Sequence, residues 1–222
     1  MQILMDYGDY SESELHYRQL LDSYVPNETL LYLSRYFANK PIELQITRSR
    51  KTKYGDFRPA QNEKSNKITI NKDLNPFAFM VTLIHEAAHL ECWLKHKNHV
   101  KPHGKEWKLY FKELMQPYIR LQIFPSEIVL ALNKYLENPA ASSCSDVTLM
   151  KALKVFNKVD KDVFFLEDIP ENSVFMLNGN RVFQKGAKRR KLFKCKDLNN
   201  KRYYLINPLC EVTPVNNYYQ KL

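Results

Sequence analysis

The stretch Thr82–Leu90, with the sequence TLIHEAAHL, determines how the rest of the chain is interpreted. It contains the pattern HExxH in His85, Glu86 and His89, within apolar residues that suit one long buried helix from about Pro76 to Lys95. Positions four apart on a helix lie about 40° apart around its axis, so both imidazoles can face one tetrahedral metal ion. Glu86, beside the first histidine, then reaches a zinc-bound water rather than the metal. The pattern predicts a single catalytic Zn²⁺ ion and hydrolysis of peptide bonds, with Glu86 as general acid/base. The competing interpretation is a buried helix whose histidines only satisfy hydrogen bonds.

A catalytic zinc ion needs a third protein ligand and an open position for water. The compact pattern HExxHxxGxxH would require glycine at Cys92 and histidine at Lys95, so that arrangement is excluded. His96 would lie about 16 Å from His85 along the same helix, too far to share its metal. The candidates that follow the motif are His96, His99, His103, Glu106 and Glu113.

His103 fits best among these candidates. The loop through Pro102 can return the chain to the helix, and Gly104 would let it turn tightly into the next helix, expected from about Lys105 to before Pro117. The remaining histidines are interpreted as ordinary polar residues: His16, His96 and His99.

HEAAH, thirteen intervening residues and then HGKEW resemble the SprT-like metalloproteases, a family that includes the Spartan proteins. The likeness covers roughly Ile42 to Met115. It implies a zincin-like core and a protease that cleaves proteins bound or crosslinked to DNA, as in DNA–protein crosslink repair. The site residues that it implies are the zinc ligands His85, His89 and His103, the general acid/base Glu86, and the packing residues Gly104 and Trp107.

The chain of 222 residues carries a net charge of +10, and this charge is concentrated at one end. Residues 172–222 contain eleven Lys or Arg but only two acidic residues, whereas residues 1–171 contain 23 basic and 22 acidic residues. Because a concentrated positive field attracts polyanions, the C-terminal part is expected to contact DNA through phosphates, without base reading.

The predicted fold class is α+β, with two parts. Residues 1–160 are expected to form the protease core with flanking helices and a small antiparallel or mixed sheet, and residues 171–222 a basic antiparallel β module. The linker is expected around 160–170. Extended substrate is expected to pair with the edge of the small sheet beside the HExxH helix, near the strand Lys67–Asn71. The other expected helices are 12–24, one after Asn27, 125–136 and 145–157. The expected strands are 42–48, 57–61 and 67–71, with a turn at 54–56, followed by hairpins within 173–215 that turn at 178–179 and 199–200.

Basic residues of this module are candidate nucleic-acid ligands, and its aromatic residues are candidates for stacking on unpaired bases. The alternative is a solvated basic face whose aromatic side chains pack inward. Many SprT-like relatives carry a zinc ribbon here, and this chain lacks its CxxC pairs. The basic candidates are Arg181, Lys185, Lys188, Arg189, Arg190, Lys191, Lys194, Lys196, Lys201 and Arg202, and the aromatic ones are Phe183, Phe193, Tyr203 and Tyr204.

The remaining features concern compartment and competing functions. The start MQILMDYGDY is not typical of a secretory signal, and the longest apolar stretch is too short to span a membrane, so a cytoplasmic monomer is expected, with the nucleoid as an alternative location. The four cysteines are expected to be reduced thiols, Cys195 and Cys210 being the one pair that could face each other.

One competing function is a nucleic-acid-binding protein with a structural or vestigial metal site. Another is an RNA hydrolase of the HxxxHxxGxDH type, which the missing GxDH disfavours.

Overall fold

The computed structural model of the chain comprises two compact units, Met1–Asn157 and Lys158–Leu222. Each unit has its own hydrophobic core. The structure describes residues 10–50, 53–60, 65–139, 146–157, 163–177 and 180–215.

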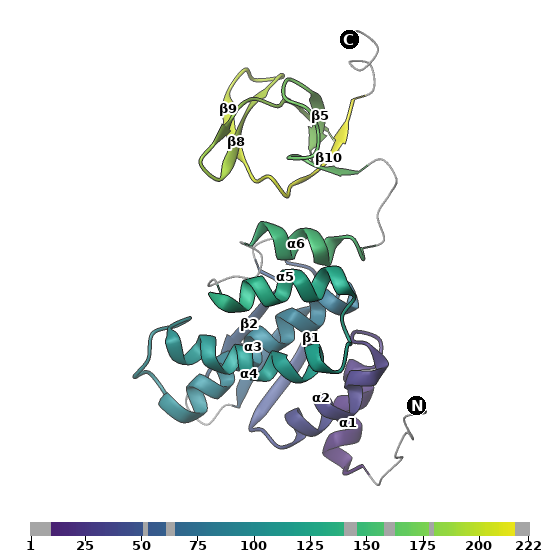
Figure 1. The fold of residues 1–222 in the computed structure, drawn as a ribbon, viewed down its shortest axis with the longest axis vertical. Coiled ribbons are helices and arrows are strands. Elements are labelled where there is room, and N and C mark those ends of the chain that lie inside the picture. The colour runs from purple at the N-terminus through teal and green to yellow at the C-terminus, as the bar shows by residue number, and fades with distance from the viewer. Residues whose placement is uncertain are drawn as a thin grey trace. The chain divides into compact units, whose positions relative to one another are not determined.

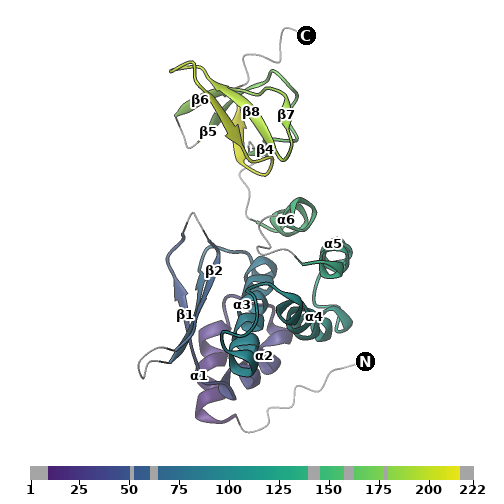
Figure 2. The ribbon, with the colours of Figure 1, turned by 90° about the vertical axis from the view of Figure 1, so that its left-hand side faces the viewer.

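The first unit combines helices with a three-stranded sheet (Figure 1). The elements of this unit are α1 (Glu12–Leu21), a 3₁₀ turn (Asn27–Thr29), α2 (Leu30–Ala38), β1 (Ile42–Thr47), β2 (Gly55–Arg58), β3 (Asn66–Asn71), α3 (Pro76–His96), α4 (Lys105–Arg120), α5 (Ser126–Glu137) and α6 (Val147–Lys154). Figure 2 shows the central helix α3 between the sheet and α4.

The sheet has the order β1-β3-β2, with β3 parallel to β1 and antiparallel to β2. One prediction about this sheet was wrong. Gly55 and Asp56, expected in a turn, belong to β2 because they pair with Ile70 and Thr69. The segment Lys67–Asn71 lies in the central strand, so the sheet edge beside α3 is that of the neighbouring strand β2.

Helix α3 is buried around most of its circumference, which explains why apolar residues occur on nearly all its faces. Its start is fixed by Asn75, whose side chain accepts hydrogen bonds from the backbone N–H groups of Phe77 and Ala78. Phe79 and Leu83 are fully buried, and each such side chain contributes about 1.5–3 kcal/mol to folding. The helix that carries HExxH is therefore held rigidly by the core.

Helix α4 runs three residues past Pro117, although the sequence was expected to end it earlier. Proline removes one backbone hydrogen bond of the helix. The loss is tolerated because Pro117 lies in the last turn and because Met115 and Tyr118, on either side of it, are buried in the core. The other predicted helices are confirmed, with α1 and α6 shorter than expected.

The second unit is an antiparallel sheet in the order β4-β10-β5-β6-β8-β7, with β9 paired to β8. Phe164 and Phe165, expected in the linker, instead form β4 and pair with β10. The turn at Asn199–Asn200 is confirmed, since both backbone N–H groups donate to the Asp197 carboxylate. The turn expected at Asn178–Gly179 lies outside the described residues. The strands are β4 (Phe164–Phe165), β5 (Val174–Leu177), β6 (Arg181–Gln184), β7 (Lys188–Arg189), β8 (Leu192–Asp197), β9 (Tyr203–Ile206) and β10 (Glu211–Pro214).

Two expectations about cysteines and membranes can be compared with the structure. Cys92, Cys195 and Cys210 are not joined in disulfide bonds within the described residues, and Cys144 lies outside those residues. None of the helices in the described ranges has the length and apolar character that crossing a membrane requires.

Candidate metal centre

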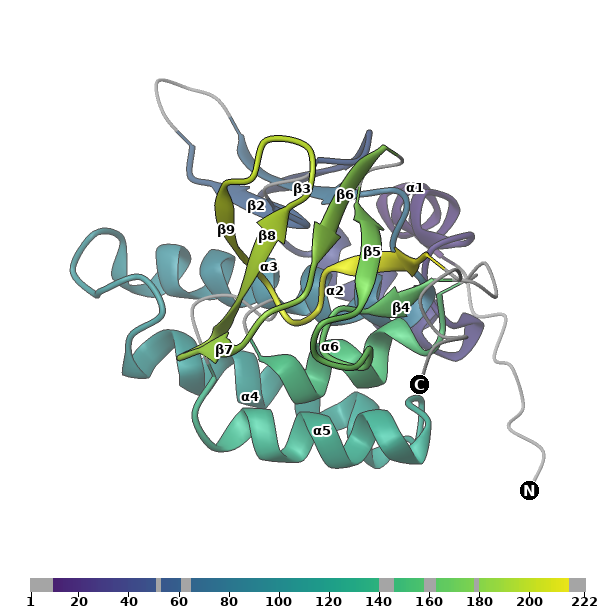
Figure 3. The ribbon, with the colours of Figure 1, turned by 90° about the horizontal axis from the view of Figure 1, so that it is seen from above.

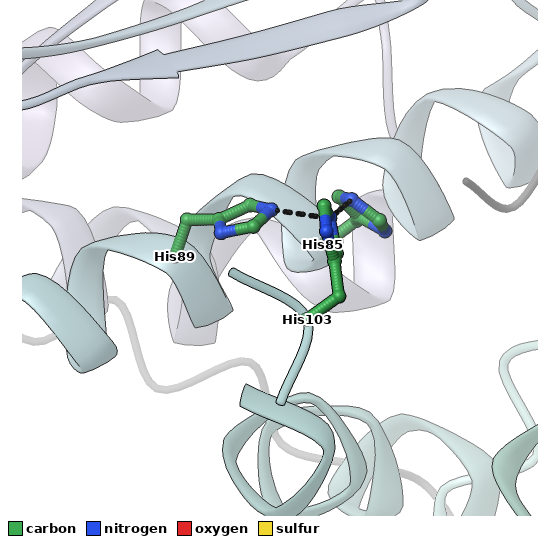
Figure 4. Close-up of side chains that lie close together, drawn as sticks. All are labelled: His85, His89 and His103. Carbon is green, nitrogen blue, oxygen red and sulfur yellow. Dashed lines mark hydrogen bonds between the residues drawn. The ribbon is translucent and has the colours of Figure 1, made fainter. Parts of the chain in front are cut away.

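Three imidazoles from two separate segments converge at one point of the first unit (Figure 4). His85 and His89 lie one turn apart on α3, and His103 comes from the loop before α4. The Nε2 atom of His103 lies 2.9 Å from that of His89 and 3.3 Å from that of His85. Among the described residues, these are the only ones grouped closely enough to hold a metal ion.

The loop that carries His103 has unusual backbone geometry. His103 adopts φ 57°, a left-handed conformation that costs a non-glycine residue about 1–3 kcal/mol. Gly104, expected to make the turn, is instead extended, with φ −70° and ψ −171°. Its lack of a side chain matters for space, because a Cβ there would lie 2.9 Å from the backbone oxygen of Lys101. The fold therefore holds a strained histidine in place beside α3.

Trp107, in the first turn of α4, packs against the imidazoles and restricts their positions. Its ring centroid lies 4.6 Å from that of His85, 5.4 Å from that of His89 and 4.8 Å from that of His103, and the ring stacks on that of Phe111 at 5.1 Å. Its indole N–H donates to the backbone oxygen of His85 over 3.4 Å. The packing role expected for Trp107 is confirmed by these contacts.

The three histidines fit a zinc ion in spacing and in protonation. Zinc–nitrogen bonds of about 2.0–2.1 Å in a tetrahedral site place two ligand nitrogens about 3.3 Å apart, close to the separations found here. Burial, together with repulsion from the neighbouring imidazoles, lowers the pKa of His85 and of His89 to about 3. Burial also lowers the pKa of His103. The rings are therefore neutral near pH 7, which leaves nitrogen lone pairs free for a metal.

The other candidate ligands do not join this group. The His96 ring nitrogen lies 2.9 Å from the hydroxyl of Tyr110, while His99 and Glu113 are exposed. Glu106 lies 3.7 Å from the ammonium of Lys105. His103 is thus the third histidine that the structure brings to the motif.

Glu86 is buried beside the imidazoles and faces β2. It accepts a hydrogen bond from the backbone N–H of Phe57. Burial, followed by repulsion from Asp56, raises the pKa of Glu86 to about 8. Asp56 is itself held by two cations, with Lys53 and Arg58 each at 2.8 Å. Glu86 therefore has no salt-bridge partner of its own within the described residues.

The imidazoles and Glu86 open onto a cleft of about 660 Å³. One wall is β2 with Gly55, Asp56 and Phe57, and the Phe57 ring lies parallel to that of His89 at 6.4 Å. Sequence reasoning did not identify these three residues as part of the site. The segment is too short to show an alternating pattern, and nothing in its spacing links it to HExxH.

The predicted nucleic-acid ligands of the second unit are not all at the surface. Lys185 is only 4% exposed, and its ammonium donates to the backbone oxygens of Glu167 and Ile169. Arg181 forms an ion pair with Asp197 at 2.7 Å. Phe183 and Phe193 point into the core, so the expectation that they stack on bases was wrong. The basic residues that remain at the surface or half-buried are Lys188, Arg189, Arg190, Lys191, Lys194, Lys196, Lys201 and Arg202.

An HExxH helix joined by a third histidine from a following loop defines a candidate metal centre of the metalloprotease type. Residues 27–127 match the model of the SprT-like family. The resemblance inferred from HEAAH and HGKEW is thereby confirmed. No curated protein and no solved structure gives a significant match.

Proposed function

We propose that the chain is a zinc-dependent metalloendopeptidase with a zincin-like catalytic core. The observation that carries this proposal is the convergence of three neutral imidazoles next to a buried carboxyl group, all facing one cleft. Strongly shifted pKa values in a cleft are typical of catalytic sites. The match to the SprT-like family supports the same assignment.

His85, His89 and His103 would hold the zinc ion, and Glu86 would move the proton. Zinc at this position supplies a Lewis acid that lowers the pKa of a water and polarises the scissile carbonyl. The positive charge of a bound zinc ion would favour the carboxylate form of Glu86 and so would lower its pKa below the value of about 8 that burial gives it. Glu86 accepts a proton from the attacking water and returns it to the leaving amine as the C–N bond breaks.

The peptide substrate would lie along β2. This strand pairs with β3 by one edge only and lines the cleft beside Glu86. An extended peptide can add to such an edge through main-chain hydrogen bonds, which holds the scissile bond straight. A structure of the Glu86→Gln variant with a substrate-like peptide should place the peptide against Gly55–Phe57. A peptide bound away from β2 would remove this part of the proposal.

The natural substrates would be proteins bound or crosslinked to DNA, with the second unit contacting DNA phosphates. The SprT-like match and the surface cations of β7–β9 support this assignment. A chain ending at Asn157 should bind DNA more weakly and with a smaller salt dependence, while it keeps its zinc. DNA affinity equal to that of the full chain would contradict the role of the second unit.

Cleavage by the full chain and by two matched glutamate variants tests the catalytic proposal. Glu86→Gln should retain zinc and lose about 10²–10⁴-fold in the rate of casein cleavage, because it lacks the proton acceptor. Glu91→Gln changes a buried glutamate of the same helix that does not line the cleft, and it should cleave normally. Equal cleavage by wild type and Glu86→Gln would contradict the mechanism. Zinc binding without casein cleavage in the wild-type chain would favour the alternative, a nucleic-acid-binding protein with a structural or vestigial metal site.

A further inference from the structure

The strands β8 and β9 present an outward face formed by Lys194, Lys196, Tyr203 and Leu205, which we call the β8–β9 face. In the antiparallel register Lys194 pairs with Leu205 and Lys196 with Tyr203, so these four side chains point to the same side of the sheet. The side chains of Tyr203 and Leu205 are large and mostly uncovered, with 58% and 60% of their surface exposed. An aromatic ring and an aliphatic side chain thus lie side by side between two lysines.

The opposite side of the same strands already supplies the core of the unit. Phe193, Cys195 and Ile206 alternate with the outward residues and are buried. Figure 3 shows β9 next to β8 on the side away from β6. The core of the unit is therefore formed without Tyr203 and Leu205. Their exposure does not result from incomplete packing of the core.

Positive charge surrounds the β8–β9 face. The Lys194 ammonium lies 4.1 Å from the centroid of the Tyr203 ring. The only acidic residue between Arg181 and Ile206 is Asp197, which is 1% exposed and paired with Arg181. Further cations come from β7 and from the turns on either side of β8, and no salt bridge joins any of them within the described residues: Lys188, Arg189, Arg190, Lys191, Lys201 and Arg202.

We propose that the β8–β9 face binds single-stranded nucleic acid, with a base stacked on Tyr203, an adjacent base or sugar against Leu205, and phosphates near Lys194 and Lys196. Unpaired bases offer the flat apolar surface that an exposed tyrosine can stack on, and a duplex keeps that surface inside its own stack. A protein partner for this face would have to be strongly acidic and also apolar. Every nucleotide of a single strand combines a negatively charged phosphate with the flat apolar surface of an unpaired base. The proposal deepens the nucleic-acid role proposed for the second unit and does not depend on peptidase activity.

The proposal is tested by measuring the affinity of the full chain for labelled oligonucleotides. Fluorescence anisotropy reports the binding, and the titrations are repeated over a range of salt concentrations. The probes are a 15-nucleotide oligothymidylate, the matching oligouridylate and a 15-base-pair duplex; the first two distinguish DNA from RNA as the preferred strand. Tyr203→Ala should weaken single-strand binding about 5- to 150-fold, the equivalent of one lost base stack, and leave the salt slope unchanged. Tyr203→Phe should restore binding, and duplex binding should change little in either variant.

The lysines should respond differently from the tyrosine. Replacing Lys194 and Lys196 together by alanine removes two phosphate contacts, so the slope of log affinity against log salt should fall by about 1.4 for single strands. Tyr32→Ala, which removes an exposed tyrosine of α2 in the first unit, is the matched control and should bind like wild type.

Two results would overturn the proposal: unchanged single-strand binding in Tyr203→Ala, or equal losses for single strands and duplex. A second measurement covers the case in which the variants fold poorly. Ultraviolet crosslinking of a bromouracil-containing single strand to the wild-type chain should label the peptide that contains Tyr203. Labelling confined to other segments, or competition by an acidic peptide but not by oligothymidylate, would contradict the proposal.

Discussion

Two buried glutamates on helix α3, Glu86 and Glu91, occupy opposite electrostatic environments. Each is 7% exposed. Glu91 lies 2.6 Å from the ammonium of Lys40 and accepts a hydrogen bond from the Tyr36 hydroxyl at 2.7 Å. Burial alone would raise the pKa of Glu91, but these two partners outweigh it and hold the pKa below its ordinary value.

Glu86 lacks comparable partners, so burial and the nearby Asp56 raise its pKa to about 8. The fold thus neutralises one buried carboxylate with a cation and leaves the other beside the imidazoles without one. An unpaired titratable group in a cleft is costly for stability, and its retention there is consistent with a role in proton transfer. The comparison separates a structural glutamate from a candidate catalytic one on the same helix.

Among the predictions from this comparison, we expect the largest effect from a substitution that moves the Glu86 side chain without replacing it. The quantity affected is the rate of casein cleavage. A Cβ on Gly55 would lie 2.7 Å from Glu86 Oε1 and 2.7 Å from Thr82 Cγ2, so Gly55→Ala must shift the carboxyl group. Misplacement by about 1 Å can lower a rate about 100-fold, and we expect a loss of that order in casein cleavage. Zinc content should not change. Normal cleavage by Gly55→Ala would show that the position of Glu86 against β2 is unimportant.

Replacing each glutamate by glutamine should change stability in opposite directions. In metal-free protein at pH 7, Glu86→Gln should stabilise the fold by about 2–3 kcal/mol, because it removes a group that must bind a proton in order to fold. Glu91→Gln should destabilise the fold by about 1–2 kcal/mol, because Lys40 loses its charged partner. Urea unfolding of the chelated proteins measures both. Effects of the same sign would contradict the assignment of separate roles.

The pH dependence of stability should show a smaller contrast. The raised pKa of Glu86 means that the folded state keeps a proton that the unfolded state loses above about pH 4.5, so this contribution is full below that pH and disappears toward pH 8. The lowered pKa of Glu91 has the opposite consequence: its contribution is present above about pH 4.5 and is lost as the pH falls further. In metal-free protein, each glutamine variant should lose the part of the pH dependence of the unfolding free energy that comes from its own glutamate. A Glu86→Gln profile parallel to that of wild type between pH 5 and 8 would contradict this expectation.

The sequence predicted the features that depend on local spacing. His85 and His89 follow from helix periodicity, and His103 follows from the motif HGKEW, since each signal is contained in a few neighbouring residues. Helix α3 and most of the strands of the second unit were identified for the same reason, because their apolar patterns are regular.

The features that were missed depend on contacts between distant segments. Gly55 and Asp56 form a strand only because they pair with β3, and a four-residue strand carries too little pattern to reveal this. Lys185 resembles a surface cation in sequence, yet backbone oxygens 16 and 18 residues away satisfy its ammonium inside the unit. Pro117 continues a helix because its neighbours are held in the core.

The zinc content of purified protein after His103→Ala, measured by mass spectrometry, tests the central claim most directly. The account predicts one zinc ion per chain in the wild type and in the control His99→Ala, whose histidine is exposed in the same loop. It predicts little or no zinc in His103→Ala, because two imidazoles on one helix cannot complete the site. Full zinc content in His103→Ala would show that the ring at position 103 is not a ligand and would contradict the proposed metal centre.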